Sequence, residues 1–200
     1  MSPRTDEQYE AIRKEKRELI LQTALEMFAG EGYHATTINS IAVRAKISKG
    51  LVYNYFSSKQ ELLKEIIHSG FINLVKLYEG IDSLADPREK ISILSFRTIE
   101  MMLENREYWK LYFLLLMQPQ IVESFYEDLV KISAPYIKTH VDIFREMGYE
   151  DPETEALFYG MMLDGFSLNV LVNPLMSPEG PFFEKIKKRM LNSYKDGKNI

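Results

Sequence analysis

The sequence contains no cysteine. This absence excludes disulfide bonds, thiolate nucleophiles and cysteine-ligated zinc sites, and it is consistent with a reducing cytoplasm. The three histidines, His34, His68 and His140, lie far apart and never at the H-x-x-x-H spacing of a helical metal site. Nucleophile elbows and glycine-rich phosphate loops are missing as well. We therefore expect no catalytic residue, no metal and no cofactor, and we expect the protein not to be an enzyme.

Long hydrophobic runs are also scarce. The longest apolar stretch, residues 156–172, is interrupted by Asp164 and Asn169 and falls short of a bilayer span. The first 18 residues are polar and charged, without the apolar core of a signal peptide. We expect a cytoplasmic protein without a membrane partner, in which residues 156–172 form a buried helix.

Carboxylates are missing from one segment. The chain has 29 acidic and 25 basic residues, yet residues 32–60 contain Arg44, Lys46, Lys49 and Lys59 and no Asp or Glu. At the average frequency of 29 in 200, a segment of this length would hold about four carboxylates. A locally positive segment in an acidic chain is typical of a surface that binds a polyanion.

The same segment has the pattern of two short helices joined by a tight turn. Apolar residues recur at helical spacing over residues 38–45, directly after Thr36-Thr37, and threonine is a good N-cap. Lys46-Ile47 interrupt the pattern. Ser48 then caps a second helix, in which the apolar residues of 52–56 share one side. Such a pair of helices allows the N-terminus of the second to enter the DNA major groove.

From Ile20 to Leu62 the chain resembles the DNA-binding domain of the tetracycline-repressor (TetR) family of bacterial transcription regulators. The matching residues are Ile20, Ala24, Phe28, Gly32-Tyr33, Thr36-Thr37, Ile41-Ala42, Ala45, Ser48-Lys49-Gly50, Tyr53, Tyr55-Phe56, Lys59 and Leu62. Lys46 departs from the family pattern, which usually has glycine in this turn. A left-handed residue other than glycine costs on the order of 1 kcal/mol, which a packed domain tolerates.

The resemblance implies specific DNA contacts. Thr37 and Tyr53 would bond phosphates, Lys59 would add a phosphate contact, and Lys49 would read guanine. The full set of DNA-binding residues implied in this way is Thr37, Ser48, Lys49, Gly50, Tyr53, Asn54, Tyr55 and Lys59. The alternative is that the two tyrosines are core aromatics and the lysines are ordinary surface charges.

The remaining chain is also helical in pattern, so the fold class is all-α with about nine helices. Capping and proline signals predict helices over residues 6–29, 59–79, 107–117 and 120–147 and helices that start near residues 87, 152 and 182. We divide the chain into a helix-turn-helix DNA-binding domain, residues 1–60, and a ligand-binding and dimerisation domain, residues 61–200.

The resemblance places a ligand pocket among the fifth to eighth helices, where this chain is rich in methionine and aromatic residues. Such residues line adaptable apolar cavities, and they equally form plain core. The candidates are Met101, Met102, Trp109, Tyr112, Phe113, Met117, Phe125, Phe158 and Met162. Nearby carboxylates (Glu100, Glu104 and Asp164) would favour a cationic lipophile.

The last two helices form the dimer interface if the resemblance holds. The helix that starts near residue 152 is apolar nearly all round, and such a helix must be covered on every side. The predicted interface residues are Gly160, Leu163, Ser167, Leu171, Phe183, Ile186 and Met190.

Two functions are consistent with the sequence. The first is a dimeric, ligand-responsive transcription regulator, a repressor that a small lipophilic effector releases from a palindromic double-stranded DNA operator. The second is an all-helical binding protein for lipophilic molecules with a non-functional DNA head. The net charge of −4 suits the second better, whereas the carboxylate-free segment favours the first.

Overall fold

The computed structural model describes residues 5–194, and within this range it is helical without any β-strand. The all-α fold class is thus confirmed. The α-helices are α1 (Asp6–Glu31), α2 (Ile38–Arg44), α3 (Lys49–Tyr53), α4 (Lys59–Val75), α5 (Pro87–Glu104), α6 (Arg106–Leu116), α7 (Pro119–Glu146), α8 (Pro152–Val172) and α9 (Phe183–Asn192). Three short 3₁₀ helices lie at Lys76–Tyr78, Ile81–Ser83 and Pro174–Met176.

Side-chain caps define most helix starts. Outside α7 and α9, each α-helix begins with a side-chain oxygen that accepts a hydrogen bond from a backbone N–H of the first turn; the caps are Thr5, Thr37, Ser48, Ser58, Asp86, Asn105 and Asp151. These bonds satisfy donors that a helix leaves unpaired at its N-terminus. The helix starts predicted at Ser48, Ser58 and Asp86 are therefore confirmed by the hydrogen bonds that cause them.

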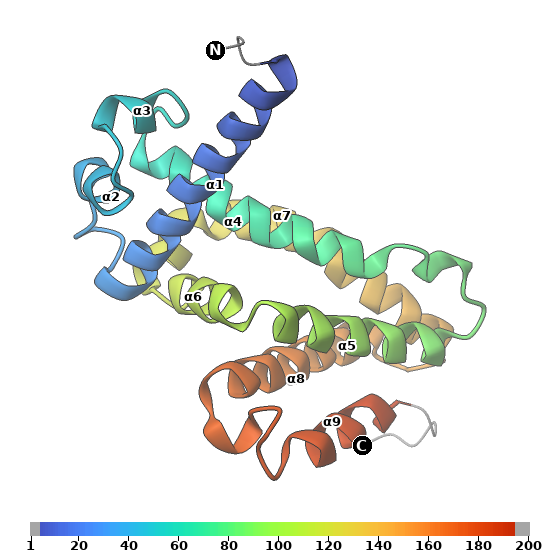
Figure 1. Cartoon of the computed structure of the whole chain (residues 1–200). Helices are drawn as coiled ribbons and strands as arrows, with labels where there is room; N and C mark the ends of the chain where they lie inside the picture. Colours follow the sequence, from blue (N-terminus) through green and yellow to red (C-terminus); the bar gives the residue numbers. More distant parts are fainter. Residues whose placement is uncertain (1–4, 195–200) are drawn as a thin grey trace.

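The predicted DNA-binding head, which comprises α1 to α3, shares its core with part of the second half of the chain. Buried residues of α1 to α4 pack in one cluster with Trp109 and Leu115 of α6 and with Ile121 and Phe125 of α7. The head, α6 and the start of α7 therefore form one packed unit, and packing does not separate the chain at residue 60. In Figure 1, α2 and α3 lie at one end of this unit.

A second cluster lies at the other end of the molecule. It joins α5, the C-terminal part of α7, α8 and α9, with Phe144 and Tyr159 fully buried at its centre. The helices α4 and α5 both extend from the region of the head towards this end (Figure 1). They bridge the two clusters, as do α7 and α8, which contribute buried residues to both.

Candidate DNA-binding surface and effector cleft

The turn between α2 and α3 has the geometry expected from the sequence. Lys46 is left-handed, with φ of 55°, and among residues 5–194 it is the only non-glycine residue with positive φ. The strain, on the order of 1 kcal/mol, is borne by a turn between the buried residues Ala42 and Val52. The expected left-handed lysine is confirmed.

Helix α3 presents a polar surface to solvent. Val52 is fully buried and holds the helix on the core, while Lys49, Gly50 and Asn54 are exposed. Tyr53 is 48% exposed, and the Lys49 ammonium lies 5.8 Å from the centre of its ring. A short helix with its N-terminus, a cation and a phenol all accessible can approach a DNA groove.

Several predicted contact residues also have local structural roles. Thr37 forms a reciprocal capping pair with Ser40, since its Oγ1 accepts from the Ser40 N–H at 3.0 Å and its own N–H donates to Ser40 Oγ at 2.9 Å. Ser48 Oγ accepts from the Leu51 N–H at 3.1 Å. Tyr55 packs partly against the core. Thr37 and Ser48 remain exposed, so a DNA phosphate could still reach their hydroxyl groups.

The geometry does not fit the predicted phosphate contact of Lys59. Its ammonium donates to the carbonyl oxygens of Tyr33 at 2.7 Å and Thr36 at 2.9 Å, with His34 O at 3.4 Å, and lies 4.3 Å from the centre of the Tyr33 ring. Partial burial lowers the pKa of Lys59. Because an ammonium group has three N–H donors, we reassign Lys59 to holding the loop that precedes α2.

The same loop is held from its other side by Gln118, which the sequence did not single out. The Gln118 Nε2 donates to Phe28 O at 2.7 Å, and the Tyr33 N–H donates to Gln118 Oε1 at 3.3 Å. Gln118 is the N-cap residue of α7. It therefore ties the α6–α7 turn directly to the end of α1. The bonded residues are 85 and 90 positions apart, and no sequence spacing rule predicts a contact over such a separation.

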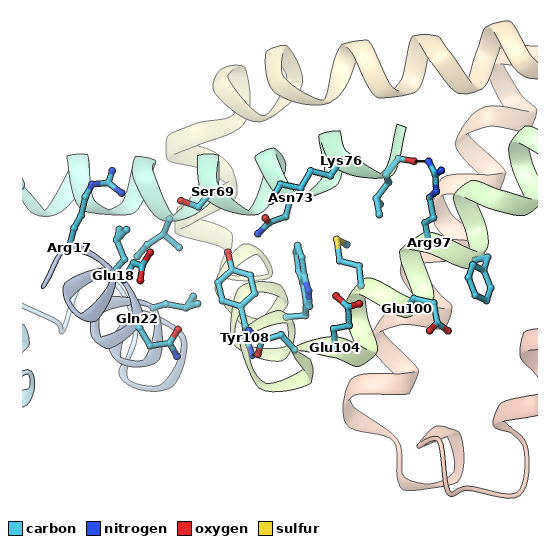
Figure 2. A pocket seen from close by; sticks show the side chains of 18 residues that line it. Arg17, Glu18, Gln22, Ser69, Asn73, Lys76, Arg97, Glu100, Glu104 and Tyr108 are labelled. Atoms are coloured by element: carbon cyan, nitrogen blue, oxygen red, sulfur yellow. Dashed lines mark hydrogen bonds between the residues drawn. The ribbon is translucent and has the colours of Figure 1, made fainter. Parts of the chain in front are cut away.

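A cleft of about 820 Å³ opens between α1 of the head and the helices of residues 59–116. It is lined by α1, α4, α5 and α6 and by the 3₁₀ helix Lys76–Tyr78 (Figure 2). Of the fifth to eighth helices expected around the pocket, the fifth and sixth line this cleft, whereas the seventh and eighth do not. Its lining residues are Arg17, Glu18, Leu21, Gln22, Leu25, Ile66, Ser69, Asn73, Lys76, Leu77, Phe96, Arg97, Glu100, Met101, Glu104, Asn105, Tyr108 and Trp109. One wall of the cleft is thus α1, a helix of the DNA-binding head.

Only Met101 and Trp109 of the predicted ligand residues line this cleft. Met102, Tyr112 and Phe125 are buried in the first core cluster, against which Phe113 also packs, and Met162 packs against the second. Met117 and Phe158 are exposed at the surface. The structure therefore separates residues that composition alone grouped together. Glu100 and Glu104 do line the cleft, whereas Asp164 lies on the exposed face of α8.

Tyr112 connects the cleft wall to α4. Its ring fits against Gly70, where a Cβ atom would lie 2.2 Å from Tyr112 Cζ, and its hydroxyl donates to Ile67 O at 2.9 Å. It also packs edge-on against Trp109, with ring centres 5.5 Å apart. A displacement of Trp109 by a ligand would consequently act on α4 through Tyr112.

The predicted dimer face requires revision. Leu163, Ser167, Leu171, Phe183 and Met190 are buried within the chain, so they cannot also contact a partner. Gly160 and Ile186 alone of the predicted set retain access to solvent. The apolar side chains that α8 leaves accessible are Leu157, Phe158, Met161, Leu168 and Val172, with Phe182 and Ile186 accessible near or on α9. The five residues on α8, which we call the α8 stripe, recur at helical spacing along one face of the helix.

No group of three histidine, aspartate or glutamate side chains in residues 5–194 is placed to hold a metal ion. His140 lies instead among aromatic rings: its Nε2 is 3.0 Å from Tyr78 Oη, and its ring centre is 4.9 Å from that of Tyr159. Burial lowers the pKa of His140 to about 4. The imidazole is therefore neutral at physiological pH and acts as part of the core.

The fold and the exposed α3 surface define an all-helical protein with a DNA-binding helix-turn-helix. Residues 20–66 match the family described as bacterial regulatory proteins, tetR family. The chain is 37% identical over 89 residues to the transcriptional repressor KstR2 of Mycolicibacterium smegmatis, which covers 42% of this chain and 43% of that protein. Across the curated relatives that it matches, the chain spans 19% to 54% of the relative's length.

Solved structures extend the similarity over most of the chain. A Clostridium perfringens protein, provisionally described as a fatty acid metabolism regulator, is 26% identical with a TM-score of 0.70, over 91% of this chain and 99% of that one. A TetR-like transcriptional regulator from Rhodococcus sp. RHA1 has a TM-score of 0.73 at 20% identity, over 98% of both chains. Residues 20–66 thus match the TetR family, and the fold of the whole described chain is similar to that of the TetR-like regulator. Within residues 5–194, no helix is long and apolar enough to cross a membrane.

Proposed function

We propose that the protein is a dimeric transcriptional repressor that binds a palindromic DNA operator and is released when a small lipophilic effector enters the cleft. The observation that carries this proposal is that α1 belongs to the DNA-binding head and also forms a wall of the cleft. A ligand in the cleft therefore contacts the head itself. The coupling free energy between ligand binding and DNA binding equals the difference in the ligand's affinity for the two positions of the head.

The DNA-binding part of the proposal rests on residues 32–60. Within this segment the Arg44 guanidinium donates to Glu31 Oε1 at 2.7 Å, and Lys59 is bonded to backbone carbonyls. Lys46 and Lys49 are exposed and form no ion pair with another described residue. Lys49, at the start of α3, is thus the cation best placed to read a base, and Lys46 to contact a phosphate.

The partner in the dimer is a second copy of this chain, seated on the α8 stripe. Met161 is 65% exposed and Leu157 54% exposed, and an apolar stripe of this length along one helix is unfavourable in water. A two-fold axis through this face would relate the two α3 helices by the same symmetry as the two halves of a palindromic operator. Successive major grooves require a separation of about 34 to 36 Å.

The division of the chain near residue 60 is retained as a functional one. Residues 1–60 supply the DNA contacts, and residues 61–200 supply most of the cleft and the dimer face. The two parts communicate through Tyr112, which rests on α4, and through Gln118, which is bonded to the loop before α2. Both contacts start from α6 or from the turn that follows it.

Selection of bound duplexes from a random library, with titrations at two salt concentrations, tests the DNA-binding function. Recovery of a palindrome whose affinity falls steeply with salt supports the regulator. Lys49→Ala and Tyr53→Ala should weaken that binding, while circular dichroism and sedimentation show an unchanged fold and dimer. Equal binding by the variants and the parent protein would contradict the assignment and favour the lipophile-binding protein with a non-functional head.

A further inference from the structure

The α5 wall of the cleft already receives one cation of the chain itself. Lys187, from α9, places its Nζ 3.4 Å from Glu100 Oε1 and 5.7 Å from the centre of the Phe96 ring. Glu100 and Phe96 both line the cleft. A carboxylate next to an aromatic face is a favourable site for an ammonium group, because both attract positive charge.

A second carboxylate of α5, Glu104, lines the cleft one helical turn further along the helix, together with Tyr108 and Trp109 of α6. The Glu104 carboxylate has no hydrogen-bond or ion-pair partner within residues 5–194. Figure 2 shows Glu104 and Tyr108 extending from the α5–α6 side of the cleft towards α4, from which Asn73 approaches them. A carboxylate and the Tyr108 ring therefore face one open space.

Two of the three basic residues of the cleft are engaged elsewhere, whereas the exposed Lys76 has no ion-pair partner within residues 5–194. The Arg17 guanidinium forms an ion pair with Glu65. The Arg97 guanidinium donates to Leu77 O at 2.6 Å and to Glu79 O at 2.8 Å. Beside Tyr108 the charge without a protein partner is the negative charge of Glu104, whereas Lys76 lies on the α4 side of the cleft (Figure 2), so the Glu104 end of the cleft disfavours an anionic head group.

We propose that the cleft binds a lipophilic cation, such as an amine or quaternary onium ion with bulky apolar substituents. Its charge lies beside Glu104 and the partly buried ring of Tyr108, next to the buried Trp109. Its apolar body covers Leu21, Leu25 and Ile66, which belong to the floor shared by α1 and α4. This inference rests on the effector cleft of the proposed function and specifies the chemistry of its ligand.

The fluorescence of Trp109 tests the proposal directly, because the chain has one tryptophan and it lines the cleft. Tetraphenylphosphonium and tetraphenylborate, ions of similar size and opposite charge, are titrated into the full-length protein. We expect saturable quenching by the cation and little by the anion. Glu104→Gln should weaken cation binding about fivefold, the effect of an exposed charge beside aromatic rings. Glu107→Gln, which removes an exposed charge outside the cleft, should have no effect.

Laurate, a fatty acid anion, is titrated in the same way. Three outcomes would overturn the assignment of a cationic ligand: no saturable cation binding, tighter binding of tetraphenylborate or of laurate, or equal cation affinity in Glu104→Gln and the parent protein. Tighter laurate binding would point to acyl ligands instead. The titration contains no DNA, so its failure leaves the operator titrations untouched. Conversely, a protein that binds the cation and no palindrome would lose the proposed regulatory function and keep the cleft assignment.

Discussion

Acidification should destabilise the protein, and His140 accounts for part of the effect that a single substitution can isolate. Its ring is partly buried against Tyr78 and Tyr159, and this burial lowers its pKa from 6.5 to about 4. In the unfolded chain the same imidazole titrates near 6.5. Between pH 6.5 and 4 the unfolded state therefore binds the proton and the folded state does not, so the free energy of unfolding falls as the pH decreases.

The size of this effect follows from linkage. A depression of about 2.5 pKa units corresponds to roughly 3 kcal/mol between pH 8 and pH 4, and most of it is lost by about pH 4.5. Above pH 7 the contribution is complete. For a chain of this length, a change of 1 kcal/mol shifts the melting temperature by about 2 to 4 °C, so this term alone amounts to roughly 6 to 12 °C.

Urea unfolding at several pH values, at one fixed protein concentration, measures the effect. The matched variant is His140→Gln, which does not titrate and can still bond the Tyr78 hydroxyl. The carboxylates of the chain contribute to the pH dependence of both proteins, and their contributions cancel in the difference between the two. The parent protein should lose about 2 to 3 kcal/mol more than the variant between pH 7.5 and 4.5. Parallel curves would refute the reasoning, since His140 would then titrate alike in both states.

Four further substitutions test the site and the interface. Gly50→Ala should leave the melting temperature unchanged or slightly raised, since a Cβ there meets only Ser48 Oγ at 4.0 Å, yet weaken operator affinity in a binding titration; unchanged affinity would contradict a close backbone approach to DNA. Gly70→Ala should destabilise by about 1 to 3 kcal/mol in urea unfolding because Tyr112 must move, whereas Gly30→Ala, with open space at its Cβ, should not. Gln118→Met should abolish the slowed hydrogen exchange of the Tyr33 amide and reduce operator affinity, and unaltered exchange would remove its role as a link. Met161→Glu should yield a folded monomer in sedimentation, and a persisting dimer would place the interface elsewhere.

The local features of the head were predictable from the sequence because their causes are local. A threonine or serine caps the helix that begins next to it, and Thr37, Ser48 and Ser58 do so here. Glu61, three residues after Ser58, has the spacing of a capping box, in which its carboxylate would accept from the Ser58 N–H, but it accepts from the N–H and hydroxyl of Ser57 instead. Both bonds lower the pKa of Glu61. The alternative acceptor lies one residue away, and spacing rules do not resolve that difference.

The ligand residues illustrate the limit of composition. Trp109, Tyr112 and Phe113 are neighbours on α6, yet Trp109 lines the cleft, Tyr112 rests on Gly70, and Phe113 packs against the first core cluster. Their residue types are equally suited to core and to pocket. Which of the two they enter depends on the position of α1 and α4, which lie more than 30 residues away in sequence.

The sequence by itself determined the helical class, the helix-turn-helix with its left-handed Lys46, and most helix starts, because these depend on backbone dihedral preferences and hydrogen bonds within a few residues. Only the tertiary structure decided which face of α8 is exposed, since apolar side chains surround that helix and give it no preferred inner side. It also decided that Lys59 bonds the backbone carbonyls of the loop before α2, and that Gln118 bonds the N–H of Tyr33 in that loop and the carbonyl of Phe28. Those contacts join segments about 25 to 90 residues apart, and long-range packing alone brings such segments together.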